Sequence, residues 1–240
     1  MNELDHYKKR QRDVLGEFLH ELKTPLTIIR THLESEIPND NIPLDVRKKM
    51  VMDVEEVARL TTLISHMKTI LSCEFEDEKI DFKTNSFLAL LVDVIELLEP
   101  LADEKEIKVS FIAAQNIEYL FDHDKCKQLF YNLINNAIKY TPHGGKIDVL
   151  LAQDETSITI VIKDNGYGIS KKDQQHIFKQ FYRCNTNKGT IEGSGLGLTL
   201  CDAIATMHQA KIEVESQRDV GSTFKVIFKK TVIDSKEVLS

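Results

Sequence analysis

Apolar residues recur at intervals of three and four along the first 74 residues, a spacing typical of amphipathic helices. The pattern predicts one helix over 2–36 and a second over 44–74. Between them, two prolines and three Asn or Asp residues predict a loop over 37–43. Because one antiparallel hairpin cannot bury both apolar seams, we expect two copies to dimerise as a four-helix bundle. A hairpin packed against the rest of its own chain is the alternative.

Shorter apolar segments follow an acidic stretch at 75–79, which we interpret as a linker. Mixed strands and helices of this kind favour an α/β sandwich, a mixed sheet with helices on one face. We therefore expect a helical hairpin over 1–74, an α/β domain over 80–232 and a tail over 233–240. The predicted strands lie at 80–82, 107–112, 117–121, 146–152, 157–163, 211–216 and 223–228, and the predicted helices at 86–105, 124–140 and 196–207.

Composition narrows the possible partners. The formal charge of −7 argues against general binding of nucleic acid or anionic membranes. No apolar run approaches the roughly 20 residues of a membrane helix, so we expect no direct membrane insertion of this sequence. The four cysteines are widely spaced without a CxxC pair, which favours reduced cytosolic thiols. Six of the ten glycines lie between 166 and 197, which indicates a specialised loop region.

One histidine on the first helix stands apart from the apolar stripe. At roughly 100° per residue, His20 lies almost opposite the middle of the stripe formed by Val14, Phe18, Leu22, Pro25, Ile29 and Leu33. Glu21 is its neighbour, and Thr24 lies one turn further on the same side. Pro25 removes one backbone hydrogen bond and should bend the helix. An exposed imidazole beside a carboxylate and a hydroxyl suggests chemistry, although a lone surface histidine is usually unremarkable.

A second candidate cluster lies on the predicted helix 124–140. Asn132, Asn136 and Lys139 share one helix face through their spacing of four and three. Amide oxygens suit a hard cation such as Mg²⁺, and a lysine one turn on is a natural phosphate partner. Taken alone, such a cluster is more typical of a solvated helix face than of a binding site.

Two glycine-rich segments and an aromatic one complete the candidates. Asp164 ends an apolar strand and precedes Gly166 and Gly168, so its carboxylate could accept a hydrogen bond from an amine such as that of adenine. The segment 193–198 opens a helix, where backbone N–H groups can bind an anion. A polar stretch, not a strand, leads into it, which favours a mobile lid over phosphates rather than a dinucleotide fold. In 178–183 we expect Phe178 and Phe181 in the core and Arg183 at the site.

Taken in order, these segments resemble the sensor histidine kinases of two-component systems. His20-Glu21 with Thr24-Pro25 is similar to the phosphoacceptor box of that family. The segments 132–140, 164–168, 178–183 and 193–197 resemble its N box, first glycine box, F box and second glycine box, and Gly221-Ser222-Thr223 resembles its last small motif. One departure is visible, because Gln209-Ala210 stands where the family usually has a Gly pair.

The resemblance implies an all-α helical hairpin that dimerises to a four-helix bundle, followed by an α/β sandwich of the histidine-kinase ATPase type. It implies ATP and Mg²⁺ as cofactors, with Asp164 on the adenine amine and Asn136, assisted by Asn132, on the metal. The remaining cofactor-binding residues that it implies are Lys139, Tyr140, Gly166, Gly168, Ile169, Phe181, Arg183, Gly193, Gly195, Leu196, Gly197, Leu198 and Thr223.

The implied activity is autophosphorylation of His20, assisted by Glu21, and phosphoryl transfer to an Asp of a response-regulator receiver domain. Thr24 is implied in a phosphatase reaction on that regulator. The expected protein is a homodimer through its two long helices, without a nucleic-acid partner, and the cytoplasmic portion of an inner-membrane sensor kinase. A catalytically silent dimeric scaffold and a conformational ATPase of the gyrase/Hsp90-type fold are the alternatives.

Overall fold

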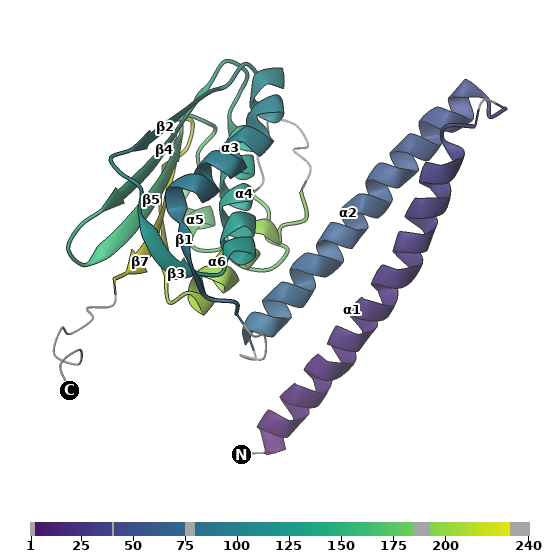
Figure 1. Ribbon diagram of the computed structural model, residues 1–240, viewed down its shortest axis with the longest axis horizontal. Helices are drawn as coiled ribbons and strands as arrows, with labels where there is room; N and C mark the ends of the chain where they lie inside the picture. Colours follow the sequence, from purple (N-terminus) through teal and green to yellow (C-terminus); the bar gives the residue numbers. More distant parts are fainter. Residues whose placement is uncertain (1–2, 40, 75–79, 185–192, 231–240) are drawn as a thin grey trace. The chain divides into compact units, whose positions relative to one another are not determined.

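The computed structural model describes residues 3–39, 41–74, 80–184 and 193–230. The chain divides into two compact units, Met1–Glu78 and Lys79–Ser240, which we refer to as the helical hairpin and the α/β unit (Figure 1). The linker predicted at 75–79 and the tail predicted at 233–240 lie outside the described residues. Of the helices described, none has both the length and the apolar character needed to cross a membrane.

The hairpin consists of α1 (Glu3–Glu36) and α2 (Leu44–Glu74), which confirms both predicted helices. Only part of the apolar stripe of α1 is buried within the single chain. Leu19 is 3% exposed and Leu26, seven residues further on, is half-buried. Phe18, Leu22 and Ile29 are instead 54%, 37% and 47% exposed. The helix therefore carries a second apolar surface that the single chain leaves in contact with solvent.

The α/β unit holds a five-stranded mixed sheet in the order β2-β4-β5-β7-β6. Strands β2 and β4 are parallel and the other neighbours antiparallel. Helices α3, α4 and α6 cover one face (Figure 1), which confirms the predicted α/β sandwich. The elements are β1 (Lys83–Ser86), α3 (Phe87–Glu104), β2 (Lys108–Ala113), β3 (Glu118–Phe121), α4 (His123–Tyr140), β4 (Lys146–Gln153), β5 (Ser157–Asp164), α5 (Lys171–Gln174), α6 (Gly197–Met207), β6 (Lys211–Gln217) and β7 (Gly221–Lys229).

Two details differ from the prediction. Residues 80–82 are not a strand; β1 begins at Lys83 and pairs with β3 in a separate two-stranded sheet. Before β1, the Phe82 ring packs edge-on against His208, with centroids 5.3 Å apart. The short helix α5 was not predicted, since four residues are too few to show a helical period.

The alternation of buried and partly buried residues along β5 determines the face of the sheet on which Asp164 lies. In β5, Ile158, Ile160 and Ile162 are buried toward the helices, whereas the residues between them are only partly buried. Successive strand residues point to opposite faces, so Asp164 continues the buried series at the end of the strand. The fold thus places one carboxylate beneath α4, at the margin of an apolar core.

The end of α6 shows how the chain closes a helix without the usual glycine. Gln209 adopts the left-handed conformation, with φ of 52°. The Ala210 N–H donates to Ala205 O at 2.8 Å and the Gln209 N–H to Thr206 O at 3.0 Å, a pattern that satisfies carbonyls at a helix end. The cap predicted to form without glycine is confirmed.

Candidate functional site

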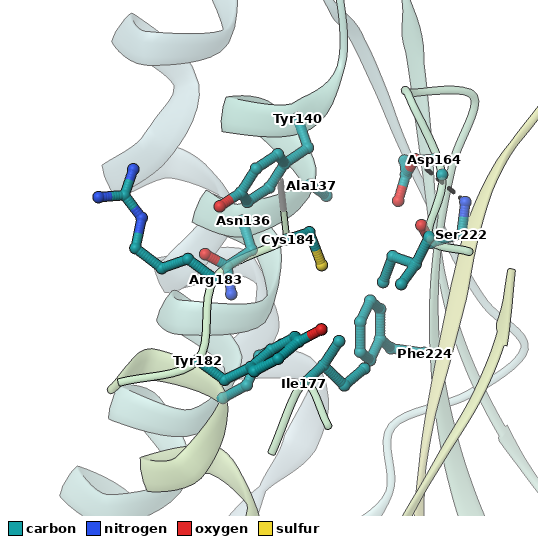
Figure 2. Close-up of a pocket in the computed structure, with 13 residues that line it drawn as sticks. Asn136, Ala137, Tyr140, Asp164, Ile177, Tyr182, Arg183, Cys184, Ser222 and Phe224 are labelled. Carbon is teal, nitrogen blue, oxygen red and sulfur yellow. Dashed lines mark hydrogen bonds between the residues drawn. The ribbon is translucent and has the colours of Figure 1, made fainter. Parts of the chain in front are cut away.

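A pocket of about 650 Å³, counted to its open mouth, lies between α4 and the ends of β5 and β7. Figure 2 shows side chains of α4 on one wall and those of the sheet on the other, with Ile177 and Phe224 toward the base. Sites for small ligands are usually apolar with a few polar groups, and the lining of this pocket has that character. The lining residues are Asn136, Ala137, Tyr140, Asp164, Gly168, Ile169, Ile177, Tyr182, Arg183, Cys184, Leu198, Ser222 and Phe224.

Asp164 is the buried carboxylate of this pocket, at 7% exposure. Its Oδ1 accepts the Gly166 N–H at 2.8 Å and the Ser222 N–H at 3.2 Å. Burial raises the pKa of this carboxyl above its usual value, and the two main-chain hydrogen bonds act in the opposite direction. The two main-chain N–H groups therefore fix the orientation of the carboxylate, and its burial removes water that would otherwise stabilise the charged form.

The end of α4 contacts the loop after β5 directly. Tyr140 lines the pocket, and its carbonyl accepts the Tyr167 N–H at 3.0 Å. A Cβ atom at Gly166 would lie 2.4 Å from that carbonyl oxygen, which is closer than any side chain could approach. Glycine at 166 therefore lets the two walls of the pocket meet.

The amides of α4 lie beside the start of α6. A Cβ atom at Gly197 would lie 3.3 Å from Asn132 Oδ1 and 4.0 Å from Asn136 Nδ2. Asn132 Nδ2 donates to Gln128 O at 2.8 Å, which fixes the orientation of that amide. The three residues therefore form one polar corner, where α6 begins and where phosphate oxygens or a cation could bind.

The segment between α5 and the undescribed residues 185–192 forms the third side of the pocket. The Tyr182 hydroxyl donates to Asp173 Oδ1 at 2.6 Å, and this bond raises the pKa of Tyr182 to about 12. Burial raises the pKa of the neighbouring Cys184 thiol. In Figure 2 the Arg183 guanidinium points away from Asp164 toward the rim, so it is placed for a ligand group at the mouth of the pocket.

Gly195 follows the undescribed residues 185–192 in the sequence and packs against the segment that contains Phe181 and Tyr182. It has φ of 73°, and a Cβ atom there would lie 2.7 Å from the Phe181 carbonyl carbon. Phe181 itself has φ of 60° and is 60% exposed. The prediction that Phe181 packs in the core is therefore wrong, because its main chain rather than its ring makes the tertiary contact. The predicted lid falls largely on 185–192, outside the described residues.

His20 lies on the hairpin and is exposed, as are Glu21 and Thr24. Leu19 beside it is buried, which fixes the face on which the imidazole lies. The interior of the hairpin is therefore apolar at this level, while the histidine faces solvent as the sequence predicts.

Residues 121–232 match the family described as histidine kinase-, DNA gyrase B- and HSP90-like ATPase. Over 225 residues, 92% of the chain, the sequence is 28% identical to the sensor protein SrrB of Staphylococcus aureus, strain MRSA252. The fold matches the histidine kinase AdeS of Acinetobacter baumannii with a TM-score of 0.64 and 25% identity, over 88% of this chain and 97% of that one. The chain therefore carries a histidine kinase-, DNA gyrase B- and HSP90-like ATPase domain over residues 121–232, and its similarity to sensor histidine kinases extends over most of its length.

A further structural neighbour has only 20% sequence identity to this chain, so the likeness supports the fold and nothing more. It is full-length ShkA in complex with AMPPNP, with a TM-score of 0.77 over 91% of this chain and 46% of that one. The chain spans 38% of the length of SrrB. SrrB and the ShkA chain thus contain further sequence beyond the part that corresponds to this chain, whereas the AdeS chain is matched over 97% of its length.

The pocket brings together seven of the residues predicted for the cofactor site, drawn from four segments of the sequence. These are Asn136, Tyr140, Asp164, Gly168, Ile169, Arg183 and Leu198. Nine others do not line it: Lys139 is exposed on α4, and Asn132, Gly166, Phe181, Gly193, Gly195, Leu196, Gly197 and Thr223 lie around it or behind its walls.

Strand alternation explains the residues that sequence reasoning missed. Ser222 and Phe224 line the pocket, whereas Thr223 lies between them and points to the opposite face of β7. The buried series Phe224, Val226 and Phe228 already indicated that Ser222 shares their face. Tyr182 and Cys184 gave no comparable signal, because they lie in an irregular segment.

The donors present fit a nucleotide with a hard cation. Among the residues that the structure describes, no group of three or more His, Cys, Asp or Glu side chains could hold a metal ion. The oxygen donors at the polar corner are the amides of Asn132 and Asn136, and Mg²⁺ often takes only one or two protein ligands. The buried Asp164 carboxylate supplies a hydrogen-bond acceptor suited to an amine on the base.

Proposed function

We propose that this chain is a sensor histidine kinase, which uses ATP to phosphorylate His20 and then transfers the phosphoryl group to an Asp of a response-regulator receiver domain. The observation that carries the proposal is the buried Asp164 carboxylate, which lines a pocket together with apolar side chains. Its Oδ1 is held by two main-chain amides. Its Oδ2 can accept the exocyclic amine of adenine, which guanine lacks at the corresponding position.

The rest of the pocket divides naturally between base and phosphates. Tyr140 and Ile169 would contact the adenine ring, together with the apolar Ile177 and Phe224 at the base of the pocket. The phosphates would bind at the mouth, between Arg183, Lys139 and the backbone N–H groups of 193–197, where α6 begins. A helix start favours anions because its first N–H groups have no partner within the helix.

Asn136, assisted by Asn132, would hold the Mg²⁺ that accompanies ATP. Asn132 Nδ2 donates to Gln128 O, which leaves the Oδ1 atom directed toward Gly197, where it could coordinate the ion. When bound, the ion supplies positive charge that stabilises the negative charge on the phosphates.

His20 is the proposed phosphoacceptor, and its exposure on α1 supports access to a separate nucleotide-binding unit. One imidazole nitrogen attacks the γ-phosphorus, and an N–P bond forms as the bond to the β,γ-bridging oxygen breaks. ADP leaves with the electron pair. Glu21 hydrogen-bonds the other ring nitrogen or accepts its proton, which makes the attacking nitrogen more nucleophilic.

We also propose that two copies associate through α1 and α2, because the exposed Phe18, Leu22 and Ile29 form an apolar surface on α1. A carboxylate oxygen of the regulator would attack the phosphorus of phosphohistidine, and the N–P bond would break to return the imidazole. Thr24, exposed one turn beyond His20, would position water for the phosphatase reaction, in which the phosphoryl group on the regulator Asp is hydrolysed. A cytoplasmic location beside an inner-membrane sensor stays a prediction from the sequence.

The test is His20→Gln in the full chain, incubated with γ-labelled ATP and Mg²⁺. We expect labelling to be abolished while ATP affinity stays within about twofold, because His20 lies on the hairpin and does not line the pocket. Acid-labile, base-stable label on the unaltered chain identifies phosphohistidine. ATP hydrolysis without labelling would favour the ATPase alternative, and ATP binding with neither labelling nor hydrolysis would favour the scaffold.

A further inference from the structure

Lys105 lies at the end of α3 and directs its side chain to the end of a different helix. Its Nζ donates to Ile138 O at 2.7 Å, Thr141 O at 2.8 Å and Lys139 O at 3.0 Å. A lysine ammonium has three N–H donors, so all three are used on the carbonyls of one helix end. This arrangement places a positive charge at the negative end of the α4 dipole.

With Lys105 in place, every main-chain carbonyl of the last turn of α4 has a partner. Ala137 O accepts the Thr141 N–H at 3.0 Å, and Tyr140 O accepts the Tyr167 N–H at 3.0 Å. The carbonyls of Ile138, Lys139 and Thr141 accept hydrogen bonds from Lys105 Nζ. A helix normally leaves four carbonyls unsatisfied at this end. One side chain therefore satisfies three of the five carbonyls at this end of the helix.

This turn is also the place where the two walls of the pocket meet. It carries Tyr140 and follows Asn136 and Ala137, all three of which line the pocket. On the other wall, the Tyr140 carbonyl receives the Tyr167 N–H, and Gly166 approaches the same carbonyl closely. The Gly166 N–H in turn donates to Asp164 Oδ1 at 2.8 Å.

We propose that Lys105 is a positioning residue for nucleotide binding, which holds the end of α4 so that Tyr140 and Asp164 keep their relative placement across the pocket. The proposal rests on the proposed ATP-binding function of this pocket. Lys105 does not line the pocket, and it acts only through the main chain of α4 and the loop after β5.

Main-chain hydrogen bonds around Lys105 should preserve the fold when its side chain is replaced. The Gly144 N–H donates to Lys105 O at 2.8 Å, and the Lys108 N–H donates to Gly145 O at 3.0 Å. Burial lowers the pKa of Lys105, whereas three carbonyl acceptors around Nζ favour the charged form. The loop thus stays anchored by its backbone, and the ammonium contributes chiefly to the placement of α4.

The experiment compares Lys105→Met with a matched lysine in the full chain. Lys230 Nζ donates to Asp154 O at 2.6 Å, so Lys230→Met also removes a lysine–carbonyl bond, at the turn between β4 and β5. Calorimetric titration with ATP and Mg²⁺ should show about tenfold weaker binding for K105M. The ATP affinity of K230M should stay within about twofold of that of the unaltered chain, even if its melting temperature falls as much as that of K105M.

Hydrogen exchange of the Tyr167 amide without nucleotide gives a second readout. We expect faster exchange in K105M and unchanged exchange in K230M. Unchanged ATP affinity in K105M, or an equal loss of affinity in K230M, would overturn the proposal. Should K105M fail to fold, Lys105→Gln, which keeps two donors and loses the charge, must show the loss. If the unaltered chain binds no ATP, the proposed function fails, and Tyr167 exchange alone decides the role of Lys105.

Discussion

The two units of this chain bury their apolar residues to very different extents. In the α/β unit, Phe87 is completely buried, and its ring stacks on Phe121 with centroids 4.3 Å apart and lies 4.9 Å from Phe228. In the hairpin, Phe18 belongs to an equally regular apolar pattern and remains 54% exposed. A regular pattern therefore predicts a helix equally well in both units, but it does not say what covers the helix.

The reactive groups differ in the same way. His20 is exposed on the hairpin, whereas Asp164 is buried and held by backbone amides. A residue that is modified must be reachable from outside, and a residue that recognises a ligand must have a fixed orientation. The difference in burial thus corresponds to the difference between the proposed phosphoacceptor and the proposed nucleotide site.

The largest effect is expected from Phe87→Ala. Removal of a buried phenylalanine typically costs about 3–5 kcal/mol, so the free energy of unfolding of the α/β unit in urea should fall by that amount. Phe18→Ala should leave the urea midpoint of the α/β unit unchanged and weaken self-association by at least about tenfold in sedimentation equilibrium.

Ile112→Ala is the matched control for Phe18→Ala, because Ile112 is 59% exposed on β2 in the α/β unit. It should change neither stability nor association. Equal effects of the two substitutions on association would contradict the assignment of the dimer surface to the hairpin.

The next largest effect is expected at Asp164, where burial of the carboxylate lowers stability but the carboxylate is needed for the proposed binding of adenine. Burial raises its folded-state pKa, so the charged form of the carboxyl is less favourable in the folded state than in the unfolded one. Asp164→Asn keeps an oxygen for the Gly166 and Ser222 amides but turns an NH₂ group toward the adenine amine. We expect a melting temperature that is equal or higher, and ATP binding weakened by at least about tenfold.

His20→Gln, by contrast, should change the free energy of unfolding by less than about 0.5 kcal/mol, because the side chain is exposed. Differential scanning calorimetry on both variants separates the two cases. A clear loss of stability in D164N would mean that the carboxylate stabilises the fold as well as the site.

Acid should destabilise both units through buried histidines. Burial lowers the folded-state pKa of His66 in α2 and of His208 after α6 below the usual 6.5. The unfolded chain therefore takes up these protons first as the pH falls, and stability present above pH 6.5 is lost below it. Each histidine contributes at most about 1.4 kcal/mol per pH unit, measurable by urea denaturation between pH 5 and 8.

The two histidines differ in their partners, so substitution should separate them. His208 Nε2 accepts the Asp122 N–H at 3.1 Å, and Nδ1 lies 2.8 Å from Ile204 O. His66 Nδ1 is buried without a hydrogen-bond partner among the described residues. At pH 7, His208→Leu should cost about 1–3 kcal/mol, while His66→Leu should cost nothing or stabilise the hairpin. Equal costs would show that ring packing, not hydrogen bonding, dominates at both positions.

The smallest effect is expected at the end of α6. Gln209 is held at φ of 52°, a conformation that costs a non-glycine residue about 1–2 kcal/mol. Gln209→Gly should therefore raise the free energy of unfolding of the α/β unit by about 1 kcal/mol or less, without changing ATP affinity. A lower melting temperature would mean that the Gln209 side chain makes stabilising contacts.

Local spacing was sufficient to predict most elements of this chain. The period of three and four residues located α1, α2, α3 and α4 to within one or two residues, because a helix buries one face whatever packs against it. Residues 80–82 were misjudged because an alternating triplet carries too little pattern to say whether a partner strand is present. The pairing of β1 with β3 depends on residues that lie between 32 positions (Ser86 and Glu118) and 38 positions (Lys83 and Phe121) apart.

At the site, the order of residues along the chain was enough to show which residue types gather in which segments, because Asp164, Asn136 and the glycines lie within short motifs. Packing between distant segments decided that the face of β7 with Ser222 lines the pocket, that Gly195 packs on the main chain of Phe181, and that Lys105 Nζ binds the end of α4. Local spacing fixes the face on which a residue lies, but contacts between segments tens of residues apart depend on how the whole chain packs.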